Sequence, residues 1–144
     1  MSVSAILAPL FVQVALTFVL LFWMGRSRVA LLRSGEVKVR DIALGERQWP
    51  TKVQQAANAY HNQFEVPALF YALTALALVT RKADLAFVVM AWIFVASRLV
   101  HAYIHTTSNR VPQRFMAFLV GVVILVLMWI LFAVRIFFSE IGGA

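Results

Sequence analysis

The chain has 144 residues, of which 62% are hydrophobic and 13% are charged, and its mean hydropathy is +0.85. This composition excludes an ordinary soluble domain, in which about a quarter of the residues are charged. The absence of cysteine excludes disulfides, thiolate metal sites and a cysteine nucleophile. The formal net charge of +7 is typical of basic loops that face anionic lipid, and we expect no nucleic-acid partner.

Four apolar runs predict four transmembrane helices, at about residues 3–25, 54–80, 85–105 and 112–138. Each run is long enough to cross about 30 Å of hydrocarbon as a helix, and too uniformly apolar to be a barrel strand. The first run lacks the features of a cleaved signal peptide, so we expect it to be retained. The sequence therefore predicts an all-α integral membrane protein, a four-helix bundle that forms one domain over residues 1–144.

The basic residues predict the orientation of this bundle. The polar connection at residues 26–52 carries seven Lys or Arg residues, and the connection before the fourth span adds Arg110 and Arg114. The other side carries only Arg81, Lys82 and Arg135. Because cytoplasmic loops are enriched in Lys and Arg, we expect both basic connections in the cytoplasm and both termini outside, in a bacterial inner membrane.

The second and third spans each carry a polar stripe. On the second span the stripe consists of Gln54, Asn58, His61, Asn62 and Glu65, which share an arc of roughly 80–100°. On the third span it consists of Arg98, His101 and His105, which share about 60°.

Glu65 and Arg98 are predicted at the same depth in the membrane. Both lie about 21–23 Å from the turn at residues 81–84, at 1.5 Å of helix rise per residue. A charge at this depth is costly unless it is paired or hydrated. The sequence therefore predicts that Glu65 and Arg98 form a pair in the half of the membrane nearer the cytoplasm.

Two interpretations of the stripes stay open. Intramembrane polar groups can serve only to hold helices together. Against this, Arg110 and Arg114 flank the start of the fourth helix, where the helix dipole already favours an anion. In the second interpretation, four side chains with i, i+4 spacing converge on a metal, although Arg98 and Arg114 place positive charge there. The four are His61, Glu65, His101 and His105.

At these residues the chain resembles the MAPEG family, the membrane-associated proteins in eicosanoid and glutathione metabolism. The family has Asn-x-x-Glu followed closely by proline on its second helix. On its third helix it has an arginine followed at three and seven positions by aromatic or histidine residues. The matching residues here are Asn62, Glu65, Pro67, Arg98, His101 and His105. With Arg110 and Arg114, the pattern looks most like the microsomal prostaglandin E synthase branch.

The resemblance implies a homotrimer that binds glutathione as a cosubstrate between neighbouring subunits, near the cytoplasmic face. Arg114 would be catalytic, because a nearby guanidinium lowers the pKa of a thiol from about 8.5 and favours the nucleophilic thiolate. The residues implied to bind glutathione are Asn58, His61, Asn62, Glu65, Arg98, His101, His105 and Arg110. The chain departs from the family at two of them, since the family commonly has arginine at Asn58 and often tyrosine at His105.

The resemblance also implies the class of reaction. The thiol would be used for transfer, isomerisation or peroxide reduction on a lipophilic small molecule that reaches the site from the membrane lipid between the first and fourth helices. The alternative is a protein of the same fold that has no catalytic activity and binds lipid or a partner in the same cavity.

Overall fold

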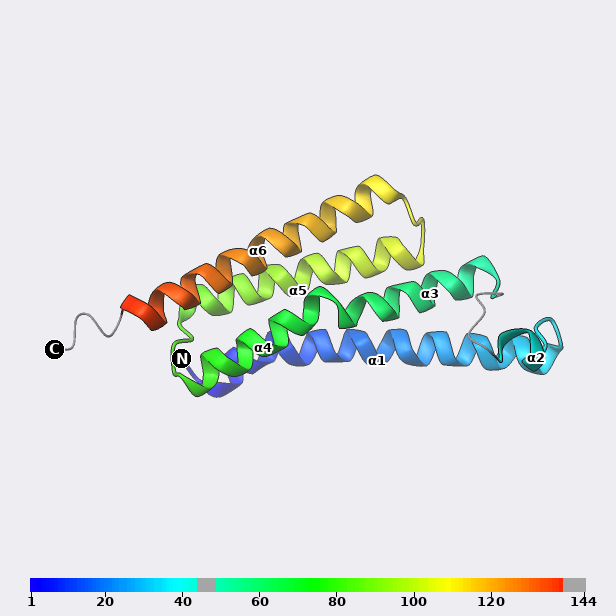
Figure 1. Ribbon diagram of the computed structural model, residues 1–144, viewed down its shortest axis with the longest axis horizontal. Coiled ribbons are helices and arrows are strands. Elements are labelled where there is room, and N and C mark those ends of the chain that lie inside the picture. The colour runs from blue at the N-terminus through cyan, green and yellow to red at the C-terminus, as the bar shows by residue number, and fades with distance from the viewer. Residues whose placement is uncertain (44–48, 139–144) are drawn as a thin grey trace.

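The computed structural model describes residues 1–43 and 49–138, and within these ranges every regular element is helical (Figure 1). The elements are α1 (Val3–Ser34), α2 (Val39–Ile42), α3 (Thr51–His61), the 3-10 helix η1 (Asn62–Phe64), α4 (Val66–Val79), α5 (Leu85–Thr106) and α6 (Val111–Phe138). Four helices are long and apolar enough to cross a membrane when α3 to α4 is taken as one. The predicted all-α membrane bundle is therefore confirmed.

The helix α5 holds the bundle together. It packs against α6, α1 and α3, whereas α1 and α6 lie on opposite sides of the bundle (Figure 1). In the core, Phe70 of α4 stacks on Phe94 of α5 with 4.6 Å between ring centroids. In lipid such contacts stabilise the bundle through close packing, because the lipid tails are as apolar as the core.

The helix α1 is longer than its apolar run. It continues to Ser34, so residues 26–34, predicted to begin the polar connection, are helical. Its 32 residues span about 48 Å, well beyond the hydrocarbon thickness of about 30 Å. The helix ends at Gly35, which has φ 76° and donates its backbone N–H to the carbonyl of Leu32, a left-handed cap that suits glycine.

The second span is broken where the sequence predicted one continuous helix over residues 54–80. The break covers η1 and Glu65, which has φ −87° and ψ −104°. Its cause is Pro67, at the start of α4. Proline has no backbone N–H, and its ring would strike the carbonyl four residues earlier, that of Gln63. The Asn-x-x-Glu motif therefore lies in an irregular turn rather than on a regular helix.

The turn between α4 and α5 is tied to the end of α6. The carboxylate of Asp84 accepts the backbone N–H of Phe87 at 3.0 Å and so caps α5. Its other oxygen pairs with the Arg135 guanidinium at 2.6 Å. Partial burial of Asp84 opposes its ionisation, but these two partners outweigh the burial and hold its pKa below the usual range.

The helices α5 and α6 come into close contact at Gly121. A Cβ atom added there would lie 2.7 Å from the hydroxyl oxygen of Ser97 and 3.6 Å from the Cδ of Arg98. Glycine at this position therefore lets α6 lie directly over the part of α5 that carries Arg98.

Candidate functional site

Arg98 is the centre of the site. Its side chain is fully buried, with 0% exposure, in the middle of the bundle. Its Nη2 donates to the side-chain oxygen of Asn62 and lies 3.5 Å from the Asn62 carbonyl oxygen. Its Nε and Nη1 atoms have no hydrogen-bond partner in the part of the chain that the structure describes. A buried guanidinium with free donors at this depth favours a bound anion.

Asn62 links Arg98 to Glu65. Its amide nitrogen donates to a carboxylate oxygen of Glu65 at 3.0 Å, while its amide oxygen accepts from Arg98. Among the described residues no ion pair joins Glu65 directly to Arg98, so the predicted direct pair is wrong. The physical reason is the break in the second span, because a helix that is not continuous leaves Asn62 between the two charges.

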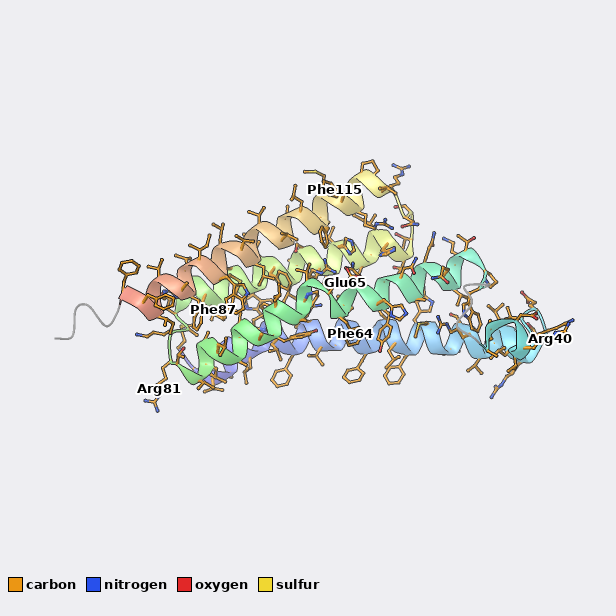
Figure 2. All side chains as sticks on the ribbon, viewed as in Figure 1. Arg40, Phe64, Glu65, Arg81, Phe87 and Phe115 are labelled. Atoms are coloured by element: carbon orange, nitrogen blue, oxygen red, sulfur yellow. The ribbon has the colours of Figure 1, made fainter. Side chains whose placement is uncertain are left out.

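Glu65 is exposed on the surface of the single chain. Figure 2 shows it at the break, midway along the bundle, where α3 gives way to α4. Its charge still stabilises the Arg98 guanidinium through space. The site therefore has a buried cation, a bridging amide and a carboxylate at its open side.

The two predicted histidines of α5 extend the site toward the loop before α6. His101 and His105 are buried, and their rings meet edge to face with centroids 5.6 Å apart. Neither Nδ1 atom has a hydrogen-bond partner among the described residues. Phe118 of α6 covers this cluster, with its ring 5.9 Å from that of His101 and 5.8 Å from the Arg98 guanidinium carbon, a cation–π contact.

Arg114, in the first turn of α6, lies within electrostatic range of the histidines. Its Nη1 donates to the side-chain oxygen of Asn109 at 2.5 Å, and its charge acts on both His101 and His105. The structure thus brings together six of the nine residues predicted for the site. They are Asn62, Glu65, Arg98, His101, His105 and Arg114.

The remaining three predicted residues lie outside this cluster in the single chain. Asn58, His61 and Arg110 are exposed. Asn58 accepts a hydrogen bond of 2.8 Å from Gln54, and the His61 ring packs against Tyr60 with centroids 5.6 Å apart. Within residues 1–43 and 49–138 no three His, Asp or Glu side chains gather as metal ligands would, so the four side chains considered for a metal do not converge there.

Two buried amides beside the site were not predicted. Gln13 of α1 is fully buried and donates to the side-chain oxygen of Gln63 at 2.8 Å. Gln63 lies inside the Asn-x-x-Glu motif. The available signal was a single amide in the otherwise apolar first run, since a polar side chain at membrane depth needs a partner.

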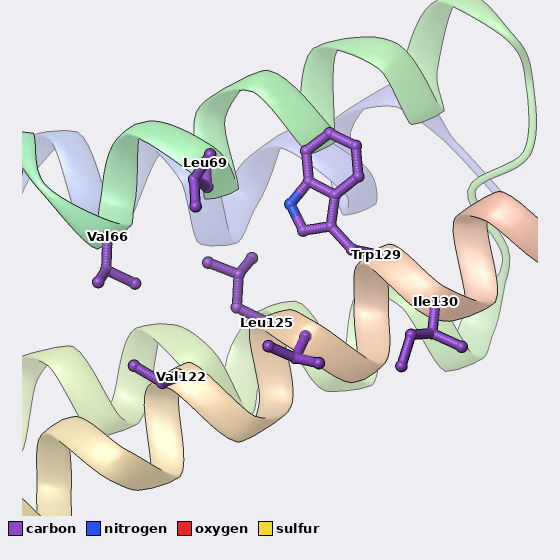
Figure 3. A pocket seen from close by; sticks show the side chains of 7 residues that line it. Val66, Leu69, Val122, Leu125, Trp129 and Ile130 are labelled. Carbon is purple, nitrogen blue, oxygen red and sulfur yellow. The ribbon is translucent and has the colours of Figure 1, made fainter.

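An apolar groove of about 300 Å³ lies between α4 and α6 (Figure 3). Val66 and Leu69 line it from α4, and Leu125 and Trp129 line it from α6. Val66 directly follows Glu65 in the chain, so the groove begins beside the open side of the site. The predicted passage between the first and fourth spans does not form within one chain, because α1 and α6 lie on opposite sides of the bundle (Figure 1).

Comparison with known proteins agrees with this arrangement. The family model described as the MAPEG family matches residues 6–134 of the chain. No curated protein and no solved structure matches it at a significant level. The match reaches all four of the membrane-spanning helices found in the described residues, and omits only the first three residues of α1 and the last four of α6. The chain therefore belongs to the MAPEG family, the membrane-associated proteins in eicosanoid and glutathione metabolism.

Proposed function

We propose that this protein is a membrane enzyme that activates the thiol of glutathione, or of a related peptide, for transfer, isomerisation or peroxide reduction on a lipophilic substrate. The observation that supports this most directly is the buried Arg98, which is held through Asn62 and keeps two donors free beside Glu65. Structural packing alone would satisfy these donors, whereas a ligand site leaves them available.

The chemistry of the site fits a glutathione-like ligand. Arg98 and Arg114 suit carboxylate groups, because guanidinium groups bind carboxylates with strong, directed hydrogen bonds. The Glu65 carboxylate, at the open side of the site, can accept a hydrogen bond from an amine or a peptide N–H of the ligand. The free Nδ1 atoms of His101 and His105 can donate or accept according to the tautomer, so His105 can supply the hydrogen bond that a tyrosine often supplies in the family.

Arg114 is the proposed catalytic residue. A thiol attacks an electrophile only as the thiolate, and a nearby guanidinium favours that form. Arg114 stabilises the negative charge on sulfur while the S–H proton leaves to solvent. In a transfer reaction the thiolate sulfur then forms a C–S bond with a lipophilic electrophile, and the bond from that carbon to a leaving group breaks, so that the leaving group departs with the bonding electron pair. The apolar groove between α4 and α6, which contacts Val66, gives such a molecule a place next to Glu65.

The proposal includes a shared site in a homotrimer. The stripe formed by Gln54, Asn58, His61 and Glu65 reaches the surface of one chain, and polar groups within a membrane need protein, water or ligand around them. A neighbouring copy that covers this stripe would bring Asn58, His61 and the rest of the site together. Native mass spectrometry that found only single copies in mild detergent would remove this part of the proposal.

We also propose that the two basic connections face the cytoplasm of a bacterial inner membrane, so that the site opens toward cellular thiols. As a finer proposal, we place the protein near the prostaglandin E synthase branch of the family. This is supported by the pattern of Arg98, His101, Arg110 and Arg114. The family match itself identifies the family as a whole and no particular branch of it.

Arg114→Ala tests the catalytic part of the proposal. We expect the wild-type protein, titrated with glutathione near neutral pH, to develop the ultraviolet absorbance of a bound thiolate, and the variant to lose it. Arg81→Ala is the matched control, because Arg81 lies in the turn at the opposite end of the bundle. Equal thiolate absorbance in all three proteins would show that Arg114 does not stabilise the thiolate.

A protein that binds lipid without catalysis is the second candidate function. The observation in its favour is the apolar groove, together with Asn58 where the family commonly has arginine. Such a protein would bind a fluorescent fatty acid with the same affinity whether or not glutathione is present, and would produce no thiolate signal.

A further inference from the structure

Gln13 is an unusual residue for its position. It lies in the apolar first half of α1 and has no exposed surface. An amide buried in such surroundings costs free energy unless it is hydrogen-bonded. Its Nε2 donates to Gln63 at 2.8 Å, and its Oε1 has no partner among the described residues. The sequence therefore keeps a polar group in α1 for the sake of its contact with Gln63.

The two glutamines form a relay that ends on the backbone of α3. Gln63 accepts from Gln13 through its side-chain oxygen, and its amide nitrogen donates to the carbonyl oxygen of Ala59 at 2.9 Å. Gln63 has only 1% exposure and Ala59 has none. The side chain of Gln63 is thus fixed at both ends, by α1 and by the last turn of α3.

This relay holds a residue that lies at the break in the second span. Gln63 is the middle residue of η1 (Asn62–Phe64), directly between Asn62 and the turn to Glu65. Pro67 weakens the regular backbone pattern here, so a 3-10 turn of three residues has few bonds of its own to set its rotation. Because the Gln63 side chain anchors the buried face of this turn, it determines which way the opposite face of the turn points.

We propose that Gln13 is a positioning residue for the site. By holding Gln63, it fixes the rotation of η1 and so places Asn62 between Arg98 and Glu65. This inference rests on the proposed function only for its consequence for ligand binding. The first span, which contributes no residue to the cluster around Arg98, would then control the geometry of that cluster from the opposite side of η1.

A purely structural role predicts a different response to mutation. Gln13→Leu alone leaves the Gln63 oxygen buried without its donor, so it should lower the thermal stability. Gln13→Leu/Gln63→Leu replaces both partners with apolar groups of similar size, which can restore stability. If the relay serves only to stabilise the fold, the double variant regains its affinity for the ligand together with its stability. If it positions Asn62, affinity stays low, because nothing then fixes the rotation of η1.

The experiment compares wild type, Gln13→Leu, the double variant and a control, Thr74→Val. Thr74 is also fully buried and also bonds a backbone carbonyl, that of Phe70 at 2.9 Å, but it lies in the middle of α4. Each protein is titrated with glutathione by calorimetry in detergent. Without ligand, each is also studied by hydrogen–deuterium exchange over residues 59–68, with tryptophan fluorescence recording the thermal stability.

We expect Gln13→Leu and the double variant to exchange faster over residues 59–68 and to bind glutathione about tenfold more weakly, the effect of losing about 1.4 kcal/mol of binding free energy. Thr74→Val should change neither the exchange rate over residues 59–68 nor the affinity for glutathione. Recovery of affinity in the double variant, or an equal loss in Thr74→Val, overturns the proposal. If wild type binds no glutathione, the proposed function fails, and the exchange measurement alone decides the role of Gln13: unchanged exchange in Gln13→Leu overturns it.

Discussion

Asn62 connects the charged side chains of Glu65 and Arg98 because an amide has both an acceptor and a donor. Its oxygen accepts from Arg98 and its nitrogen donates to Glu65. Neither a carboxylate nor an apolar side chain can do both. This explains in physical terms why an amide at the first position of the motif can join the two side chains, whereas an aspartate there could not.

Asn62→Ala should lower the free energy of unfolding by about 2–3 kcal/mol, because it leaves the buried Arg98 guanidinium without its side-chain acceptor. Asn58→Ala is the matched control, since its amide is exposed and, among the described residues, pairs with Gln54, and it should cost less than about 0.5 kcal/mol. Equilibrium unfolding followed by tryptophan fluorescence checks both. Equal losses in the two variants would contradict the account of the Arg98 environment.

Asp84 gives the protein a pH-dependent contribution to stability. Its pKa in the folded protein is lowered, so the folded state favours the carboxylate. The contribution is present above the unfolded pKa of about 3.9 and is lost as the pH falls through the folded value.

Asp84→Asn should therefore have a lower melting temperature than wild type at pH 7, because it loses the ion pair with Arg135. The two melting temperatures should converge as the pH falls below about 4. Thermal scans between neutral and acidic pH measure this difference. A difference that stays constant with pH would show that the charge of Asp84 contributes nothing.

At the scale of elements, the break between α3 and α4 takes Asn62 and Glu65 out of a regular helix, and we expect ligand binding to depend on it. Pro67→Ala restores the missing backbone N–H and removes the clash of the ring with the preceding turn, so the second span can continue as one helix. We expect stability to stay equal or rise, and glutathione affinity to fall, since Asn62 and Glu65 would return to the positions of a regular helix. Pro9→Ala in α1 is the control. Retained affinity in Pro67→Ala would show that the break is not needed.

The contact of α5 with α6 gives a second prediction at this scale. Gly121→Ala places a Cβ atom 2.7 Å from the Ser97 hydroxyl oxygen and should destabilise the protein by about 1–3 kcal/mol through overpacking. Ser97→Ala/Gly121→Ala removes that oxygen and should recover most of the loss. A double-mutant cycle of unfolding free energies measures the coupling, and simple additivity of the two changes would argue against the close approach.

The elements also show what a sequence can and cannot predict. Hydropathy located four spans because lipid demands long apolar helices. It placed the end of α1 too early, since hydropathy marks where the membrane ends, whereas the helix ends at the Gly35 cap. The break was missed although its local cause, Pro67, is visible in the sequence. Periodicity along an assumed straight helix placed Glu65 opposite Arg98 and overlooked Asn62 between them.

At the scale of the whole molecule, composition, family and structure agree on an integral membrane bundle. The family match extends over residues 6–134, and the cluster around Arg98 draws its residues from the second, third and fourth spans. The exposed stripe of α3 and Glu65 could not be explained from one chain, because its environment depends on what covers it. Sequence patterns pick out the polar residues of this stripe, but they do not show what covers it.

The most direct measurement is a calorimetric titration of the detergent-solubilised protein with glutathione, repeated with Glu65→Gln/Arg98→Leu, which removes these two opposite charges together. The account predicts saturable binding below millimolar concentration by wild type and none by the double variant. Absence of binding by wild type at millimolar glutathione, or equal binding by both proteins, would contradict the claim that the cluster around Arg98 and Asn62 is a thiol-peptide site.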